Sequence, residues 1–151
     1  MIEKYGISNY LPNAAVQPDP DLLYRLVFDC SKLPADDSSV NPGLNHIARF
    51  INLYDAAGLK PEKRVLKAII NGDAVKTAME EKEYLKCFGK ANPDSELLRE
   101  LKAKGVDIYV CAQSLIDRGF KLDTLNPEII LALSGLVVKA TLQLRGYALI
   151  P

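Results

Sequence analysis

Apolar residues in this chain gather into short runs, and the stretches between the runs show helical spacing. Each run is long enough for one strand, and most runs are apolar on both of the faces that a strand presents. Between two of them, Leu44, Ile47 and Ile51 recur three or four positions apart, as on one face of a helix. The pattern predicts strands that alternate with helices. The predicted strands are residues 23–28, 64–70, 106–110, 128–132 and 146–150.

Capping residues indicate where the predicted helices begin and end. Asn41-Pro42 and Asn92-Pro93 each place a capping side chain before a proline at the first helical position. Gly58 and Gly105 suit the left-handed conformation that often ends a helix. A short helical piece is predicted from Ala74, and the charged region that follows it through Lys90 is predicted to be helical and exposed. Further helices are predicted over residues 112–118 and 134–144.

Strands that are apolar on both faces and alternate with helices predict an α/β fold, in which helices cover both sides of a parallel sheet. Five strands in a chain of this length suit a flavodoxin-like, doubly wound sheet with strand order 2-1-3-4-5. We predict that residues 23–151 form this single domain. Residues 1–22 carry Pro12, Pro18 and Pro20 and predict an extended arm, which either packs on a neighbouring subunit or remains a flexible tail.

Net charge and the length of the apolar stretches indicate which classes of partner the chain is not expected to bind. Nineteen basic and nineteen acidic residues give a formal net charge of zero, whereas nucleic-acid binding needs a basic surface. The longest apolar stretch, residues 129–138, is too short to cross a bilayer. We therefore predict no nucleic-acid partner and no membrane partner. No signal peptide is visible, so the sequence as it stands predicts a cytoplasmic protein, and a removed leader would make it an exported one.

Three cysteines, Cys30, Cys87 and Cys111, are too few and too widely spaced for a disulfide scaffold. The single histidine, His46, lies beside an apolar helical stripe and is interpreted as structural. Because there is also no C-x-x-C pair, no metal site is predicted. The loop after the first strand, residues 31–37, has acidic residues and no glycine-rich cradle for a phosphate. We therefore predict no flavin, nucleotide or other cofactor.

Cys111 has the position of a reactive thiol, between a predicted strand and a predicted helix. The free N–H groups and the positive dipole end of a helix N-terminus favour the thiolate, which is the nucleophile of sulfur chemistry. In the order 2-1-3-4-5, strands one and three are neighbours, so Cys30 and Cys111 would share the edge at which ligands bind, with Asn71 close by. The alternative is that Cys111 is a small buried apolar residue.

One segment is specific enough to indicate a family. It is the sequence LKAKGVDIYVCAQS at residues 101–114, followed by Arg118-Gly119, and it resembles the DsrE/DsrF-like family with its YchN- and TusD-type members. The resemblance covers residues 23–151. It implies a flavodoxin-like subunit that forms homotrimers or hexamers, with one cysteine that carries sulfur as a persulfide between partner proteins. The weaker matches are residues 24–29, 44–52 and 146–150.

The resemblance assigns the sulfur to Cys111, because Cys30 and Cys87 match no family cysteine. It also implies a His-Gly pair at the end of the second strand in many relatives, where this chain has Asn71-Gly72. An asparagine can donate a hydrogen bond to a sulfur anion, but it cannot exchange a proton at neutral pH. Asn71 is therefore expected to support the anion and not to act as an acid or base.

These observations lead to the hypothesis of a sulfur-handling protein. Cys111 would take sulfane sulfur as a persulfide and pass it to or from a partner thiol, and whether it does so as a sulfurtransferase-like enzyme is left open. The donors predicted to hold the sulfur anion are the backbone N–H groups of Ala112 and Gln113, the Gln113 amide and the Ser114 hydroxyl. Gln113 and Ser114 would otherwise only cap the helix.

Two alternatives remain open. Cys30 could act as a second thiol that forms a disulfide with Cys111, provided that both side chains point toward each other. The chain could also be a non-catalytic homo-oligomeric binding or assembly module, with a crevice for a small molecule or a peptide at the carboxyl edge of the strands. In that case Cys111 is simply buried, and its alkylation at pH 6 is slow.

Overall fold

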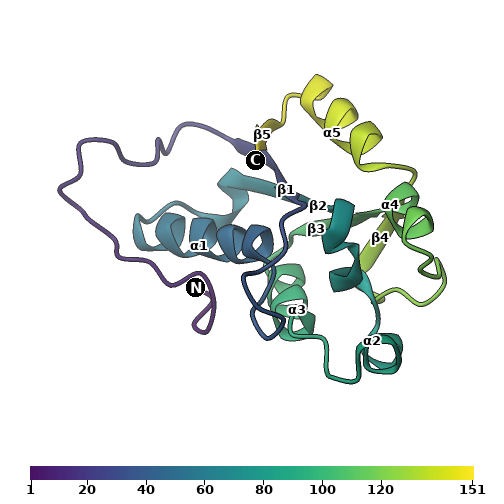
Figure 1. The fold of residues 1–151 in the computed structure, drawn as a ribbon. Coiled ribbons are helices and arrows are strands. Elements are labelled where there is room, and N and C mark those ends of the chain that lie inside the picture. Colours follow the sequence, from purple (N-terminus) through teal and green to yellow (C-terminus); the bar gives the residue numbers. More distant parts are fainter.

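Five strands form one parallel sheet in the computed structural model, which describes all of residues 1–151 (Figure 1). The strands lie within two residues of the predicted ranges. They are β1 (Tyr24–Cys30), β2 (Arg64–Ile70), β3 (Asp107–Cys111), β4 (Ile129–Ala132) and β5 (Ala148–Ile150). The helices are α1 (Pro42–Ala56), α2 (Glu81–Phe88), α3 (Ser95–Ala103), α4 (Ala112–Asp117) and α5 (Gly135–Leu144), with 3-10 helices η1 (Pro61–Lys63) and η2 (Gly72–Ala78).

The strand order is β4-β3-β2-β1-β5, and every neighbouring pair is parallel. The α/β class, the five parallel strands and the helices on both faces are confirmed, but the order differs from the predicted 2-1-3-4-5. In this sheet β2 lies between β1 and β3. The connections from β1 to β2, from β2 to β3 and from β3 to β4 each lead to the adjacent strand in the same direction across the sheet. Only the connection from β4 to β5 crosses back, to the far side of β1. An apolar strand pattern does not encode which strand is its neighbour, so the sequence did not distinguish the two orders.

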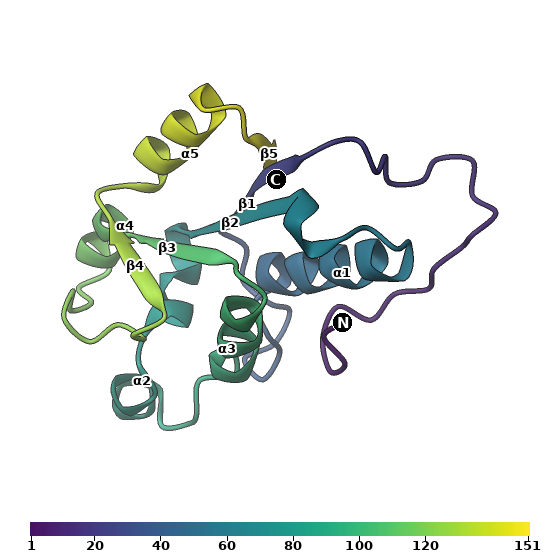
Figure 2. The ribbon, with the colours of Figure 1, turned by 180° about the vertical axis from the view of Figure 1, so that it is seen from behind.

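The two faces of the sheet are covered unequally. Since parallel crossovers are right-handed, connections that step one way place their helices on one face, and the connection that returns places its helix on the other. Accordingly, α1 and α3 pack on one face over a core of 22 buried residues. On the opposite face the buried cluster has only three residues, Val27 and Ile69 of the sheet and Leu142 of α5 itself. Figure 2 shows α5 across the sheet from α1 and α3.

Local sequence explains the ends of these elements. The Asn41 side chain accepts a hydrogen bond from the Leu44 amide at 3.1 Å, and Pro42 is the first helical residue, as predicted. The second Asn-Pro pair does not cap α3 directly. Asn92 instead accepts from the Asp94 amide and donates to two carbonyls of the preceding segment, so α3 begins two residues later than predicted.

The N-terminal arm contains no helix or strand, and it has two parts. Its first six residues are docked: Ile2 is 2% exposed, and the Asn52 side chain on α1 accepts from the Ile2 amide and donates to the carbonyls of Ile2, Tyr5 and Gly6. Gly6 has φ +63°, and a Cβ there would lie 2.1 Å from the Arg49 nitrogen, so only glycine fits. The rest of the arm loops away before entering β1 (Figure 1).

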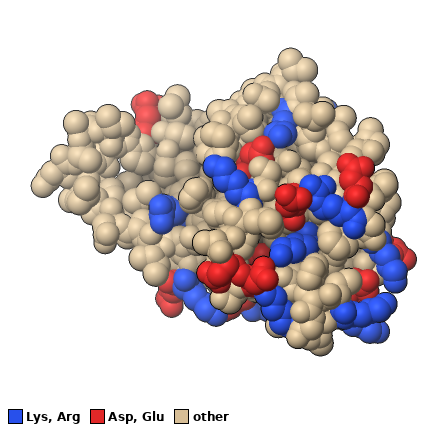
Figure 3. All heavy atoms as spheres, viewed as in Figure 1, with Lys and Arg blue, Asp and Glu red and all other residues tan.

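Charged side chains of both signs interleave over part of the surface, whereas the arm and α5 are mostly uncharged on the face shown in Figure 3. None of the helices combines the length and the apolar content that a bilayer crossing requires.

Candidate functional site

Cys111 is both the last residue of β3 and the N-cap of α4. Its sulfur accepts a hydrogen bond from the Ser114 amide at 3.4 Å, as an N-cap side chain does. The residue is 5% exposed, so nearly all of it is covered by the fold. The strand-to-helix junction that the sequence predicted is therefore present, with the sulfur on the amide end of the helix.

The electrostatic surroundings of this thiol favour its anion. Burial by itself raises the pKa of Cys111, but the hydrogen bond from the Ser114 amide, together with the nearby Ser114 hydroxyl and the amides of Gly135 and Gln113, outweighs it, and the pKa lies below the ordinary value. Gly135 is the first residue of α5. The N-termini of two helices, α4 and α5, thus converge on one sulfur atom.

Only some of the predicted donors act on the sulfur: Ser114 and the Gln113 backbone do, whereas the Gln113 side chain and the Ala112 amide do not. Ser114 contributes its hydroxyl and its amide, and the same hydroxyl accepts from the Gly72 amide at 3.0 Å, which links the site to the start of η2. Gln113 contributes its backbone N–H, while its side chain donates to the Leu133 carbonyl at 3.3 Å. Ala112 is buried, and its amide is not among the groups that lower the pKa of the thiol.

Asn71 lies at the end of β2 and donates to two oxygens, Asp29 Oδ1 at 3.0 Å and the Ile69 carbonyl at 3.3 Å. Its amide is directed to these acceptors and not to the Cys111 sulfur, so the structure does not give Asn71 the predicted role of an anion donor. The other carboxylate oxygen of Asp29 accepts from Lys139 Nζ on α5 at 2.9 Å. Burial raises the pKa of Asp29, but the hydrogen bonds from Lys139, Ser31 and Asn71 outweigh it and hold the pKa below its usual value.

Three residues of the site were missed by the sequence analysis: Asp29, Gly135 and Lys139. Each had a local signal. Asp29 lies at the carboxyl end of an apolar strand, where ligand-facing polar residues gather in parallel sheets. Gly135 interrupts the longest apolar run, and Lys139 closes it. The sequence did not show that Gly135 and Lys139 lie near Cys111, because they come near it only where α5 crosses the sheet.

The prediction that Cys30 acts as a second thiol for Cys111 is wrong. Cys30 pairs with Ile70, which in turn pairs with Val110, so a whole strand separates β1 from β3. Two strand spacings amount to about 9.6 Å, beyond the roughly 7 Å at which two Cα atoms can be bridged. Cys30 is also fully buried, and burial, with the charges of Asp29 and Asp94, raises the pKa of its thiol far above the ordinary value.

The remaining candidates lie apart from this site. Cys87 is exposed on α2, and His46 is exposed on α1. No group of three or more histidine, cysteine or acidic side chains is placed to hold a metal ion.

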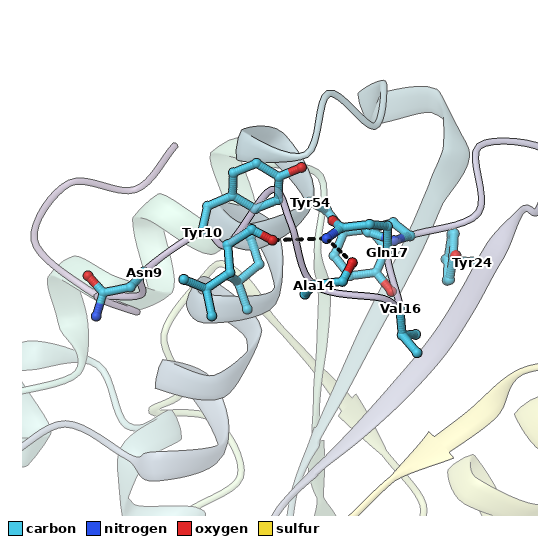
Figure 4. A pocket seen from close by; sticks show the side chains of 10 residues that line it. Asn9, Tyr10, Ala14, Val16, Gln17, Tyr24 and Tyr54 are labelled. Atoms are coloured by element: carbon cyan, nitrogen blue, oxygen red, sulfur yellow. Dashed lines mark hydrogen bonds between the residues drawn. The ribbon is translucent and has the colours of Figure 1, made fainter.

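A cavity of about 440 Å³ lies elsewhere, between the arm and the second half of α1 (Figure 4). Tyr10, Tyr24 and Tyr54 line it, and Gln17 fastens the arm beside it by donating to the carbonyls of Leu11 and Ala14. Tyr24 begins β1, whereas Cys111 ends β3. Because the strands are parallel, the cavity and the thiol lie at opposite edges of the sheet.

Comparisons with known proteins agree with this architecture. The fold is similar to that of MTH1491 from Methanobacterium thermoautotrophicum, a protein of unknown function, with a TM-score of 0.60 and 20% identity over 84% of this chain and 97% of that one. It is also similar to the YchN protein of E. coli, with a TM-score of 0.60 and 19% identity over 83% of this chain and 96% of that one. At these identities the likeness concerns the fold alone. A comparison with curated proteins gives no significant match.

The family comparison is more specific. Residues 26–151 match the model of the DsrE/DsrF-like family, which spans the sheet from β1 to β5 and includes Cys111. The resemblance seen in the sequence is thereby confirmed, and the chain belongs to the DsrE/DsrF-like family.

Proposed function

We propose that the protein is a sulfur carrier in which Cys111 holds sulfane sulfur as a persulfide and exchanges it with the thiol of a partner protein. One observation carries the proposal: donors from α4 and α5 surround a single, nearly buried sulfur atom and lower its pKa. Such an arrangement stabilises a thiolate before the transfer and a persulfide anion after it. Membership of the DsrE/DsrF-like family supports the same class of chemistry.

The transfer is a thiol exchange without net oxidation. The Cys111 thiolate attacks the outer sulfur of a donor persulfide, R–S–SH. A bond forms between the two sulfur atoms while the S–S bond of the donor breaks, and the donor leaves as a thiolate that takes the persulfide proton. Release repeats the step, since an acceptor thiolate attacks the outer sulfur of Cys111–S–S⁻ and restores the Cys111 thiolate.

The low exposure of Cys111 restricts the shape of a sulfur donor that can reach it. Because the residue is only 5% exposed, the sulfur must be delivered as the terminal atom of an extended chain. A cysteine persulfide on a protruding segment of a protein fits this requirement.

Intact mass spectrometry after incubation with glutathione persulfide tests the proposal. We expect the protein to gain one sulfur atom, and we expect the Cys111→Ser variant to gain none. Cys87→Ser is the matched control because Cys87 is the exposed thiol, and this variant should gain sulfur like the parent. The proposal fails if the sulfur is found on Cys87 or if Cys111→Ser retains it.

A second candidate function, a homo-oligomeric assembly module, is favoured by the surface of α5. Leu136 is 77% exposed and Leu144 is 89% exposed, and both lie on a helix that is apolar on most of its sides. Helices of this composition are usually buried. We therefore propose that copies of this chain associate through α5, as homotrimers or hexamers.

Light scattering coupled to size-exclusion chromatography tests this second proposal. We expect an oligomer for the parent and a smaller species for Leu136→Glu combined with Leu144→Glu. Leu85→Glu, which changes an exposed leucine on α2, is the control and should leave the mass unchanged. A monomeric parent at micromolar concentration would contradict the proposal. The reactivity of Cys111 distinguishes the two proposed functions, because a protein that serves only for assembly does not need a reactive thiol.

A further inference from the structure

The helix α5 is weakly held for an element that completes a reactive site. Only Gly135 and Leu142 of its ten residues are buried, and the apolar cluster beneath it adds only Val27 and Ile69. Its polar attachment to the sheet is the ion pair between Lys139 Nζ and Asp29 Oδ2, at 2.9 Å. Both side chains of this pair are about four-fifths buried, with 21% and 19% exposed.

This ion pair is one helical turn from the part of α5 that reaches Cys111. Lys139 follows Gly135 by four positions, so the two residues lie on the same side of the helix. Gly135 packs against Asn71, and Asn71 donates to the same carboxylate that binds Lys139. The first turn of α5, the end of β1 and the end of β2 are thus joined through Asp29.

We propose that Lys139 is a positioning residue whose ion pair with Asp29 holds the first turn of α5 over Cys111 and keeps the Gly135 amide within reach of the sulfur. The inference deepens the proposed sulfur-carrier function, because it names what keeps the thiol ready for transfer. The Gly135 amide is one of the donors that lower the pKa of Cys111. Loss of the ion pair should therefore make the thiol less acidic.

A direct electrostatic effect must be separated from positioning. The charged groups near this edge of the sheet are Asp29 on β1, Asp73 and Lys76 in η2, Asp117 and Arg118 at the end of α4, and Lys139 on α5. Asp29 pairs with Lys139, Asp73 with Arg118, and Lys76 with Asp37 of the loop after β1. If Lys139 acted by its charge, removing Asp29 would free a cation and make the thiol more acidic. If it acts by positioning, removing Asp29 releases α5 and makes the thiol less acidic. The variant Asp29→Asn therefore distinguishes the two explanations by the sign of its effect.

The experiment measures the rate of iodoacetamide alkylation of Cys111 against pH, by intact mass, in a Cys87→Ser background. The variants are compared by the midpoint of this profile, which reports the pKa of the thiol. The plateau rate is not compared, because a looser α5 would also expose the thiol and raise that rate. We expect the midpoint to rise by about one pH unit in Lys139→Met and in Asp29→Asn, which reduces the rate at pH 7 relative to the plateau about tenfold. Lys139→Arg should restore the midpoint of the parent.

Lys67→Met is the matched control. Lys67 also forms a partly buried ion pair with an aspartate of the sheet, Asp107, but this pair lies at the amino edge of β3. Lys67→Met should lower the free energy of unfolding without moving the alkylation midpoint of Cys111. An unchanged midpoint in Lys139→Met, a lower midpoint in Asp29→Asn or an equal rise in Lys67→Met would each overturn the inference. If Lys139→Met does not fold, Lys139→Gln is measured in its place.

The outcome does not depend on persulfide formation, because alkylation reports the thiol itself. A protein that gains no sulfur but shows the predicted midpoints would disprove the proposed function and leave the positioning role intact.

Discussion

Gly135, at the start of α5, packs directly against Asn71, at the end of β2. A Cβ on residue 135 would lie 3.2 Å from the Asn71 Cβ, which is closer than most such contacts in proteins, and 3.5 Å from Ile69 Cγ1, which is an ordinary contact distance. The absence of a side chain lets α5 approach the sheet, and the Gly135 amide thereby reaches the sulfur of Cys111 on the neighbouring strand.

Gly135→Ala should therefore displace the start of α5 by a few tenths of an ångström. We expect the alkylation midpoint of Cys111 to rise by roughly half a pH unit, because one amide donor moves away from the thiolate. Ala140→Gly is the control: it weakens α5 by about 1 kcal/mol through backbone entropy and adds no atom at the site, so the midpoint should not change. Equal midpoints in both variants would contradict the role of Gly135.

Ser114→Ala should affect both the thiol and the stability of the fold. The variant removes the hydroxyl that donates to Cys111 and leaves the Gly72 amide without its acceptor. We expect a higher alkylation midpoint and a free energy of unfolding lowered by about 1–2 kcal/mol in a urea titration. Ser95→Ala removes an exposed hydroxyl that donates to Glu81 and should change neither quantity by a comparable amount. An unchanged midpoint in Ser114→Ala would show that the backbone alone holds the thiolate.

Cys30 should not form a disulfide with Cys111 under mild oxidation, since β2 separates the two strands. In a Cys87→Ser background, we expect equal labelling of Cys111 by iodoacetamide before and after treatment with diamide. Cys30 should be labelled only after unfolding, because it is fully buried. Loss of Cys111 labelling, together with a mass lower by two hydrogen atoms, would refute the strand order found here.

Asn52→Ala should release the N-terminal arm from α1. Four hydrogen bonds to Ile2, Tyr5 and Gly6 are lost, and Ile2 leaves the main core. We expect the free energy of unfolding to fall by about 2–4 kcal/mol and cleavage by a protease to begin within the first six residues. Asn13→Ala, in the exposed part of the arm, is the control. Retained protection of these residues in Asn52→Ala would mean that Asn52 does not hold the arm.

Asp94 should make stability depend on pH with a definite sign. The carboxyl is buried and accepts from the Asn41 amide and the Thr77 hydroxyl, and burial raises its pKa. The folded protein therefore binds more protons at this site than the unfolded chain. The site's contribution to stability is full below about pH 4 and is lost as the pH rises through the raised pKa.

Asp94→Asn keeps an acceptor for the Asn41 amide but cannot ionise. We expect the difference in unfolding free energy, parent minus variant, to decrease as the pH rises from 4 to 7 in urea titrations. A difference that increases over this range would show that the hydrogen bonds from Asn41 and Thr77 to the carboxylate outweigh its burial, and it would contradict the prediction.

Much of the local structure followed from the sequence. The apolar runs predicted the five strands, because burial and backbone spacing act over a few residues. Asn41-Pro42 marked the start of α1, and the position of Cys111 between a strand and a helix was visible because caps and helix termini are local as well. The Cys111 thiol and two of its donors, Ser114 and Gln113, are neighbours along the chain, so local sequence was enough to name them.

The pairing of distant segments was decided only in three dimensions. Strands apolar on both faces can stand beside any other such strand, so the order β4-β3-β2-β1-β5 and the separation of Cys30 from Cys111 were not encoded in local periodicity. The contact of Gly135 with Asn71 and the ion pair of Lys139 with Asp29, 110 residues apart, arise because α5 crosses the sheet. Spacing along the chain determined which side chain could be a nucleophile, and packing across the sheet decided which groups surround it.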